Sequence, residues 1–146
     1  MAQVQLSERE VRIQKTQKMQ KMGIHPYAQS FAKKDMIQAI IDQYQDAELR
    51  DSETVITDPQ MQVCTAGRVM LYRSHGKLAF AKILDSTAQI QLLFHRDQCK
   101  IIKGEKNAEG KIIETAVESL PFDESETGVM TAYKFVEKMV DLGDFI

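Results

Sequence analysis

Three apolar stretches in the middle of the chain alternate with a period of two residues and are separated by short polar turns. They run from Gln62 to Tyr72, from Leu78 to Leu84 and from Gln89 to Phe94. Alternation with this period is typical of strands that bury one face, and tight turns join antiparallel neighbours. The sequence therefore predicts a three-stranded antiparallel meander, in which Gly67 marks a bulge or a bend.

The second of these strands indicates which side chains face inward. Ala79, Ala81 and Ile83 share one face, and their small size suits the interior of a narrow barrel. Phe80 and Lys82 then point outward from the sheet, because successive side chains of a strand lie on opposite faces.

An aromatic ring, an arginine and an amide would come together on this outer face. Arg73 ends the first strand, Phe80 lies on the second, and Gln91 faces outward on the third. A ring can stack on a base, an amide can hydrogen-bond its Watson–Crick edge, and an arginine can bind a base or a phosphate. The pattern predicts a platform for single-stranded nucleic acid. The open alternative is a one-residue slip, which would exchange the two faces and place Phe80 in the core.

Helical patterns flank the meander. A capping box at residues 7–10 predicts a helix over 7–22, which Gly23 would end. Apolar residues at helical spacing predict further helices over 34–45 and 131–140. Residues 145–146 resemble the start of a fourth strand.

This order of elements matches the oligonucleotide-binding (OB) barrel. We expect an α+β, mostly β fold: a five-strand OB barrel, incomplete here with strands 1–3 and the start of strand 4, preceded by two helices. Residues 1–60 would form the N-terminal helical segment, with an acidic loop at 46–58, and residues 61–146 the barrel domain. A polar insert at about 99–131 would contain one extra strand, at 111–117. Because the sequence ends at the entrance to a strand, we expect a piece cut short of the last barrel strands.

Charged residues are clustered along the 146-residue chain. The formal net charge is -2, but residues 1–34 and 63–106 carry +5 each, whereas 35–62 and 107–146 carry -6 each. Binding of a polyanion depends on the local field, so the net charge does not exclude a nucleic-acid partner.

Patterns that indicate catalysis or metal binding are missing. His25, His75 and His95 do not have the spacing of metal ligands, and the two cysteines form neither a disulfide framework nor a zinc site. Residues 104–111 resemble a phosphate-binding loop, but five residues separate the glycines and no Ser or Thr follows the lysine. We expect no catalytic residue, metal ion or cofactor in this chain. The sequence shows no secretory signal and no apolar run long enough to span a membrane, which predicts a cytoplasmic protein.

Short motifs in a fixed order resemble the N-terminal domain of the lysyl-tRNA synthetases, which are class II enzymes. The motifs in the meander are Gly67-Arg68-Val69-Met70, Arg73, Gly76-Lys77 followed by Phe80, Asp85, and Ile90-Gln91-Leu92. Two flanking segments are also similar to the family: Gly23-Ile24-His25-Pro26-Tyr27 and Leu142-Gly143-Asp144-Phe145-Ile146. The resemblance runs from about Glu8 to the end, except for the insert. His25 and Ala28 replace an Asn and a Pro of the family pattern, which affects only the local turn.

The resemblance implies an anticodon-binding OB-fold domain whose partner is the anticodon stem-loop of the lysine tRNA, which has a uridine-rich anticodon. Arg73, Phe80 and Gln91 match the family positions that contact anticodon bases. The expected contacts to the tRNA backbone are Arg12, Lys15, Lys18, Lys77 and Lys82. The full-length enzyme would attach lysine to this tRNA with ATP and Mg²⁺, generally as a homodimer. Its catalytic domain would be absent from this chain, so the piece alone would be inert.

Two other functions fit the same residues. One is the equivalent domain of an aspartyl- or asparaginyl-tRNA synthetase, which would bind a different anticodon. The other is a stand-alone OB module that binds single strands without sequence preference. Titration with different anticodon loops distinguishes all three.

Overall fold

The chain folds into two compact units that interleave along the sequence. The computed structural model describes residues 5–28, 30–45 and 59–146, so the acidic loop expected at 46–58 lies outside the described residues. The sheet unit comprises residues 30–93 and 141–146, and the hairpin unit comprises residues 1–29 and 94–140. The predicted boundary between residues 60 and 61 does not coincide with this division.

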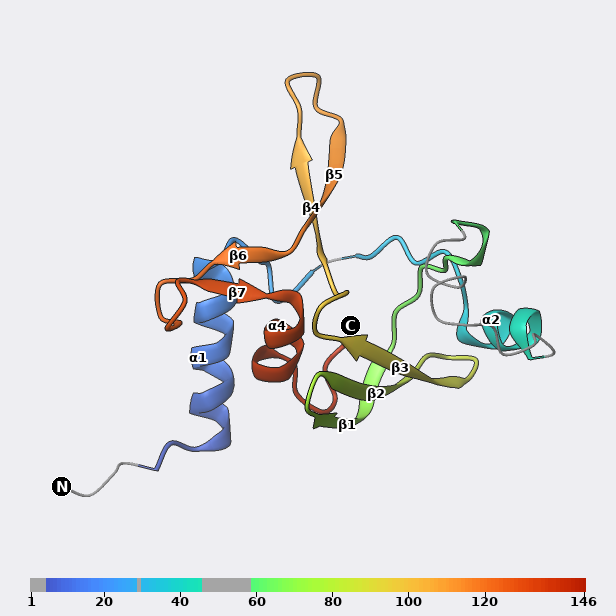
Figure 1. Cartoon of the computed structure of the whole chain (residues 1–146), viewed down its shortest axis with the longest axis horizontal. Coiled ribbons are helices and arrows are strands. Elements are labelled where there is room, and N and C mark those ends of the chain that lie inside the picture. The colour runs from blue at the N-terminus through green and yellow to red at the C-terminus, as the bar shows by residue number, and fades with distance from the viewer. Residues whose placement is uncertain (1–4, 29, 46–58) are drawn as a thin grey trace. The chain divides into compact units, whose positions relative to one another are not determined.

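The sheet unit contains the predicted meander. Strands β1 (Arg68–His75), β2 (Leu78–Leu84) and β3 (Gln89–His95) form one sheet in the order β1-β2-β3 (Figure 1), and β3 continues for two residues into the hairpin unit. Helix α2 (Ile37–Tyr44) and the short 3₁₀ helix η1 (Pro59–Met61) precede the sheet. The meander is confirmed, although its first strand begins six residues later than predicted, at Arg68 and not at Gln62.

The segment before β1 is not a strand because its backbone pairs with the segment that leads into α2. The Cys64 carbonyl accepts hydrogen bonds from the amides of Lys34 (3.0 Å) and Asp35 (2.9 Å). The Cys64 amide donates in return to Asp35 Oδ2 at 2.7 Å. This pairing satisfies backbone groups that a strand would otherwise use in a ladder.

A bulge or a bend was predicted at Gly67, and the bulge in the strand pairing lies three residues further on, at Met70. Val69 pairs with Ile83 and Leu71 pairs with Lys82, so Met70 is the extra residue of β1. Gly67 has a different role: an added Cβ would lie 2.8 Å from the carbonyl oxygen of Leu84, which is closer than real contacts allow. Glycine is therefore needed there for a close approach of two backbones.

The predicted strand start at residues 145–146 is present as an antiparallel bridge to the outer edge of β1. Gly67 and Ile146 exchange amide–carbonyl hydrogen bonds of 2.8 and 3.0 Å, and Arg68 pairs with Phe145. The Val69 amide donates to the Asp144 carbonyl at 2.8 Å.

One face of the sheet is buried, as the alternation predicted. Ala79, Ala81 and Ile83 are each 1% exposed or less, whereas Phe80 is half-buried and Lys82 is exposed on the opposite face. The two faces of β2 are therefore as predicted, and the one-residue slip is excluded. Among the described residues of this unit, the other buried hydrophobic side chains are Val69, Ile37 and Ile40.

Asp85 ties α2 to the turn between β2 and β3. Its carboxylate accepts hydrogen bonds from the amides of Ile37 (2.9 Å), Thr87 (2.7 Å) and Ala88 (3.1 Å), and it forms an ion pair with Lys33. Burial alone would raise the pKa of Asp85, but the hydrogen bonds from Lys33, Thr87 and Ile37 outweigh it and hold the pKa well below its usual range. The first turn of α2 is thus fixed by a side chain of the turn between β2 and β3.

The hairpin unit contains the predicted first and last helices. Helix α1 (Glu8–Lys21) has Ser7 as its N-cap, with the predicted capping box complete. Helix α4 (Ala132–Met139) is capped by the Thr131 hydroxyl, which accepts from the Lys134 amide at 3.3 Å. The buried side chains Phe122, Met130 and Met139 form the core of this unit, against which pack Met19, Met22 and Phe135.

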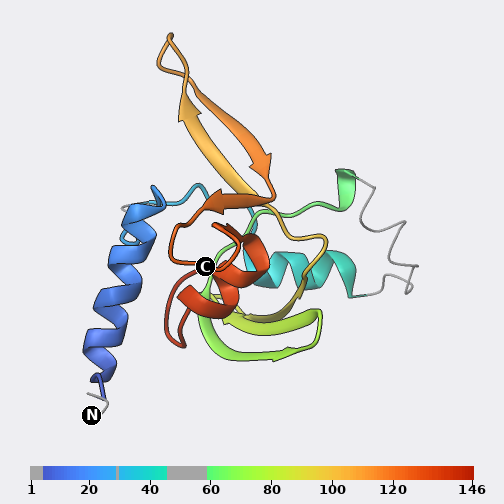
Figure 2. The same cartoon turned by 60° about the vertical axis from the view of Figure 1, so that its left-hand side comes forward.

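The predicted insert consists of two small antiparallel pairs. Strands β4 (Ile101–Lys106) and β5 (Ile112–Val117) form one pair, and β6 (Ser119–Pro121) and β7 (Val129–Thr131) form the other. The expected strand at 111–117 is confirmed as β5, but β4 was not predicted. Figure 2 shows β4 and β5 as a ribbon that extends away from β6, β7 and α1 of the same unit.

The predicted fold class is confirmed. The described residues form three α-helices and mainly antiparallel strands in open sheets, as in an incomplete OB-like barrel. Among these residues, no helix has both the length and the apolar character needed to cross a membrane.

Candidate nucleic-acid interface

The turn between β1 and β2 sets the register of the outer sheet face. Gly76 and Lys77 form a two-residue connection, and Gly76 has φ 60°, which glycine adopts without the strain of a side chain. His75 therefore pairs with Leu78, and Arg73 lies directly opposite Phe80. Directly opposite residues of an antiparallel pair share a face, so Arg73 and Phe80 are neighbours on the outer side.

Arg73 stacks on Phe80. The guanidinium carbon of Arg73 lies 5.0 Å from the centroid of the Phe80 ring, which is within the range of a cation–π contact. Arg73 is exposed and Phe80 is half-buried, so the ring is anchored in the sheet while the cation faces solvent. A guanidinium and an aromatic ring are both flat surfaces on which a base can stack. The pair thus combines a stacking surface with a positive charge.

Gln91 lies on the neighbouring strand. It is exposed, whereas Ile90 and Leu92 on either side of it are half-buried, so Gln91 belongs to the solvent face of β3. Because β3 adjoins β2, the three predicted base contacts Arg73, Phe80 and Gln91 lie on three successive strands of one sheet. Their roles toward RNA remain predictions.

The outer face is cationic. Strands β1, β2 and β3 and the turn between β1 and β2 contain no Asp or Glu, and they carry four cationic side chains: Arg68, Arg73, Lys77 and Lys82. The nearest acidic residue in the sequence, Asp85, is neutralised by its ion pair with Lys33. A polyanion therefore meets no like charge on these strands.

Two aliphatic side chains on this face were not predicted. Leu71 and Leu93 are 46% and 59% exposed. The bulge at Met70 places Leu71 opposite Lys82 on the exposed face, whereas Val69 pairs with Ile83 and is buried. The sequence indicated a bulge or a bend at Gly67, three residues before the observed bulge, and it did not indicate which way Leu71 faces.

The five predicted backbone contacts are divided between the two units. Lys77 and Lys82 lie on the sheet unit, whereas Arg12, Lys15 and Lys18 lie on α1 in the hairpin unit. Arg12 and Lys18 each form an ion pair within the protein. Arg12 lies 3.6 Å from Glu8, and Lys18 lies 3.1 Å from Glu124.

Potential metal ligands do not gather in the described part of the chain. Residues 5–28, 30–45 and 59–146 contain no group of three or more His, Cys, Asp or Glu side chains placed to hold an ion.

Comparison with known proteins identifies relatives. The lysine–tRNA ligases of Chlamydia felis and Chlamydia caviae are each 33% identical to this chain over 135 residues, which is 92% of the chain and 22% of the relative. The chain is a relative of the lysine–tRNA ligases. A third such ligase, from Fervidobacterium nodosum, is 34% identical over 125 residues, or 84% of the chain and 23% of the ligase.

These matches confirm the predicted resemblance to lysyl-tRNA synthetases. The chain spans only about a fifth of the length of the curated ligases that it matches. No family model matches the sequence.

Proposed function

We propose that the outer face of the β1-β2-β3 sheet binds the anticodon loop of a lysine tRNA, as part of a lysine–tRNA ligase. The observation that carries this proposal is the Arg73–Phe80 stack, 5.0 Å from cation to ring centroid, on strands without acidic residues. The similarity to lysine–tRNA ligases over 92% of the chain supports the choice of RNA.

Each side chain has a distinct part in this proposal. Phe80 stacks on one base of the loop, and Gln91 hydrogen-bonds a Watson–Crick edge. Arg73 extends the stacking surface and supplies a positive charge beside it. Lys77 and Lys82 contact the phosphates of the loop, which position the RNA without reading its sequence.

The activity of the complete ligase is part of the same proposal. It attaches lysine to the tRNA with ATP and Mg²⁺, and the groups that bind lysine and ATP belong to a catalytic domain outside this chain. We further propose that the complete enzyme acts as a homodimer in the cytoplasm. The role of the present chain is to hold the anticodon.

A fluorescence anisotropy titration of the chain tests the proposal. The ligands are a labelled lysine anticodon stem-loop and an aspartate one of the same length, each at two salt concentrations. We expect preference for the lysine loop at both concentrations. Equal affinity with a steep salt dependence would show phosphate contacts alone, and a stand-alone single-strand module would replace the proposal. Preference for the aspartate loop would assign the chain to the other branch of these ligases.

Two variants locate the interface. Phe80→Ala should weaken binding of the lysine loop by about 1–3 kcal/mol, the usual contribution of one base–aromatic stack, and leave folding largely unchanged. Phe31→Ala is the matched control, because Phe31 is 61% exposed in the same unit but precedes α2. Equal effects of the two substitutions on affinity would contradict the assignment of the outer face.

A further inference from the structure

The sheet unit carries a second guanidinium–ring pair besides Arg73 and Phe80. The guanidinium carbon of Arg68 lies 4.4 Å from the centroid of the Phe145 ring, which is closer than the 5.0 Å of the Arg73–Phe80 pair. Both distances are within the range of a cation–π contact. Neither residue of this second pair was predicted to bind RNA.

The pairing of β1 places the second pair on the outer face of the sheet. Arg68 lies opposite Leu84 of β2, and Leu84 shares the outward-facing side of that strand with Phe80 and Lys82. Phe145 bridges to Arg68 from the other side of β1. Because directly opposite residues of an antiparallel pair share a face, Phe145 also belongs to the outer face.

Hydrogen bonds fix the segment that carries Phe145 to strand β1. The Gly143 amide donates to the Val69 carbonyl at 2.8 Å, and the Arg68 side chain donates to the Gly143 carbonyl at 2.9 Å. The carboxylate of Asp144 accepts from a backbone amide of the same turn at 2.8 Å. The position of the ring beside the guanidinium is therefore set by the fold before any ligand binds.

The Phe145 ring is exposed to solvent although the guanidinium lies over it. Its exposed fraction is 68%, whereas Phe80 is half-buried. A ring that is already fixed in place loses little entropy when a base stacks on it. Arg68 is exposed as well, and a guanidinium has several N–H donors, so its hydrogen bond to Gly143 leaves others for a phosphate or a base edge.

The two guanidinium–ring pairs are too far apart to hold the same base. Leu84, which lies opposite Arg68, is four residues from Phe80 on β2, or about 13 Å at about 3.3 Å per residue. Bases that stack directly on each other are only about 3.4 Å apart. Between the two pairs, Leu71 and Lys82 lie opposite each other on the same face. The outer face thus presents ring, cation and ring in succession.

We propose that Phe145 and Arg68 form a second base-stacking site on the outer face, which holds a different base of the loop from the one on Phe80. The inference rests on the proposed function, since it takes the same single-stranded loop as ligand. Its basis is that the same pair of side chains occurs twice on one face of one sheet. The RNA strand crosses from the ring on β2 to the ring at the outer edge of β1, and Lys82 binds a phosphate between the two bases.

Substitution of the exposed ring tests for the second site. The labelled lysine anticodon stem-loop is titrated against the chain and against Phe145→Ala and Phe145→Tyr. Phe145→Ala should bind about 5- to 150-fold more weakly, which corresponds to one base–aromatic stack, and Phe145→Tyr should retain the affinity because it keeps a ring. The matched control is Phe31→Ala, which removes a ring that is 61% exposed in the same unit but precedes α2, and which should leave the affinity unchanged.

Stem-loops with an abasic nucleotide at each loop position in turn show whether the ring contacts a base. An abasic nucleotide keeps the phosphate and lacks the base, so it removes the stacking partner alone. One abasic position should abolish the effect of Phe145→Ala in a double-mutant cycle, and a different position should abolish that of Phe80→Ala. An effect of Phe145→Ala that is equal on all abasic loops would show a structural role and overturn the site. The same position for both rings would also overturn it, because only one base would be held.

The outcomes separate this inference from the proposed function. Unchanged affinity in Phe145→Ala overturns the second stacking site, whereas preference for the lysine loop and weaker binding by Phe80→Ala would continue to support the proposed function. If the lysine and aspartate loops bind equally and Phe145→Ala weakens both, the lysine tRNA is the wrong ligand. The second stacking site is then supported on a sheet that binds single strands in general.

Discussion

The two long hairpins of this chain, β1–β2 and β4–β5, differ in how much of their surface they bury. In β1–β2, the inner face is closed by side chains such as Val69 and Ile83, each 1% exposed. In β4–β5, most side chains are exposed on both faces, including Ile102 at 61% and Ile113 at 51%. Both hairpins are paired antiparallel along their strands, β1–β2 with one bulge and β4–β5 without a break, so the backbone ladder alone does not require a buried face.

The outer face of β1–β2 is supported by a packed core on the other side of the sheet, whereas β4 and β5 are stabilised mainly by pairing with each other. The outer face of β1–β2 carries Arg73 and Phe80 on a sheet whose other face is packed. An isolated two-stranded hairpin is marginally stable, because it buries too little apolar surface to offset the entropy of ordering its chain. A binding surface that must hold a ring and a cation in register is therefore better placed on β1–β2.

Truncation of one isoleucine in each hairpin should give the largest difference. Ile83→Ala removes a side chain that is 1% exposed and should lower the free energy of unfolding by about 2–5 kcal/mol. Ile113→Ala removes one that is 51% exposed and should change it by no more than about 0.5 kcal/mol. Urea unfolding followed by circular dichroism measures both. Equal losses would mean that β4–β5 also buries a face in solution, which would contradict the difference between the two hairpins.

The hydrogen bonds and the ion pair of Asp85 should make the stability of the sheet unit depend on pH. The pKa of Asp85 is lowered in the folded chain, so its carboxylate stabilises the fold fully above its unfolded pKa of about 3.9 and loses this effect as the pH falls toward the folded value. Asp85→Asn should lower the urea midpoint by a constant amount between pH 7 and pH 5. Below about pH 4 the gap to the unchanged chain should narrow.

Glu114→Gln provides the matched control for this titration, because Glu114 is an exposed carboxylate on β5. Its free energy of unfolding should stay within about 0.5 kcal/mol of that of the unchanged chain at every pH. If the difference in urea midpoint between Asp85→Asn and the unchanged chain widened in acid, the sign of the pH linkage would be reversed. The stabilising role of the Asp85 carboxylate would then be refuted.

The contrast between the hairpins also explains what the sequence could predict. A strand with one packed face must alternate, and β2 was predicted with its bounds and both of its faces correct. Strand β4 buries neither face, so its sequence, Ile-Ile-Lys-Gly-Glu-Lys, shows no period, and its existence was missed. Capping chemistry is local, and the box at Ser7 and Glu10 was therefore predicted in full.

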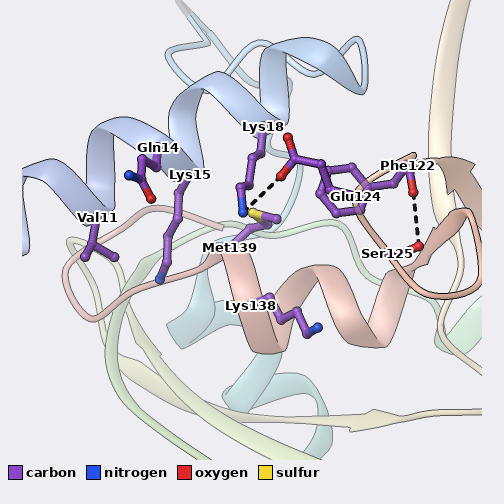
Figure 3. A pocket seen from close by; sticks show the side chains of 9 residues that line it. All are labelled: Val11, Gln14, Lys15, Lys18, Phe122, Glu124, Ser125, Lys138 and Met139. Carbon is purple, nitrogen blue, oxygen red and sulfur yellow. Dashed lines mark hydrogen bonds and ion pairs between the residues drawn. The ribbon is translucent and has the colours of Figure 1, made fainter. Parts of the chain in front are cut away.

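In the candidate interface, too, some features could be predicted from local sequence patterns and others could not. Alternation placed Phe80 and Gln91 outward, because both lie on regular strands with half-buried or buried neighbours. Predicting the Arg73–Phe80 contact required the pairing register of β1 and β2, which the two-residue turn at Gly76 sets. The exposed position of Leu71 was missed because the bulge lies at Met70, three residues after the glycine that signalled a bulge or a bend. In the hairpin unit, residues 11–18 of α1 line a cavity together with residues 122–125 and 138–139, which follow more than 100 positions later (Figure 3). No sequence pattern connects these segments.

The smallest predicted effect compares the turn glycines of the two hairpins. Gly76 and Gly110 have φ of 60° and 78°, and neither has an atom within 4 Å of an added Cβ, so alanine would meet backbone strain alone at both positions. The cost is about 1–2 kcal/mol for each turn. In Gly76→Ala it should appear in the urea midpoint, because opening this turn disrupts the packed sheet. In Gly110→Ala it should appear only as faster amide exchange in β4 and β5, because a ribbon exposed on both faces can open locally. A midpoint lowered equally by both substitutions would show that β4–β5 unfolds together with the rest of the chain.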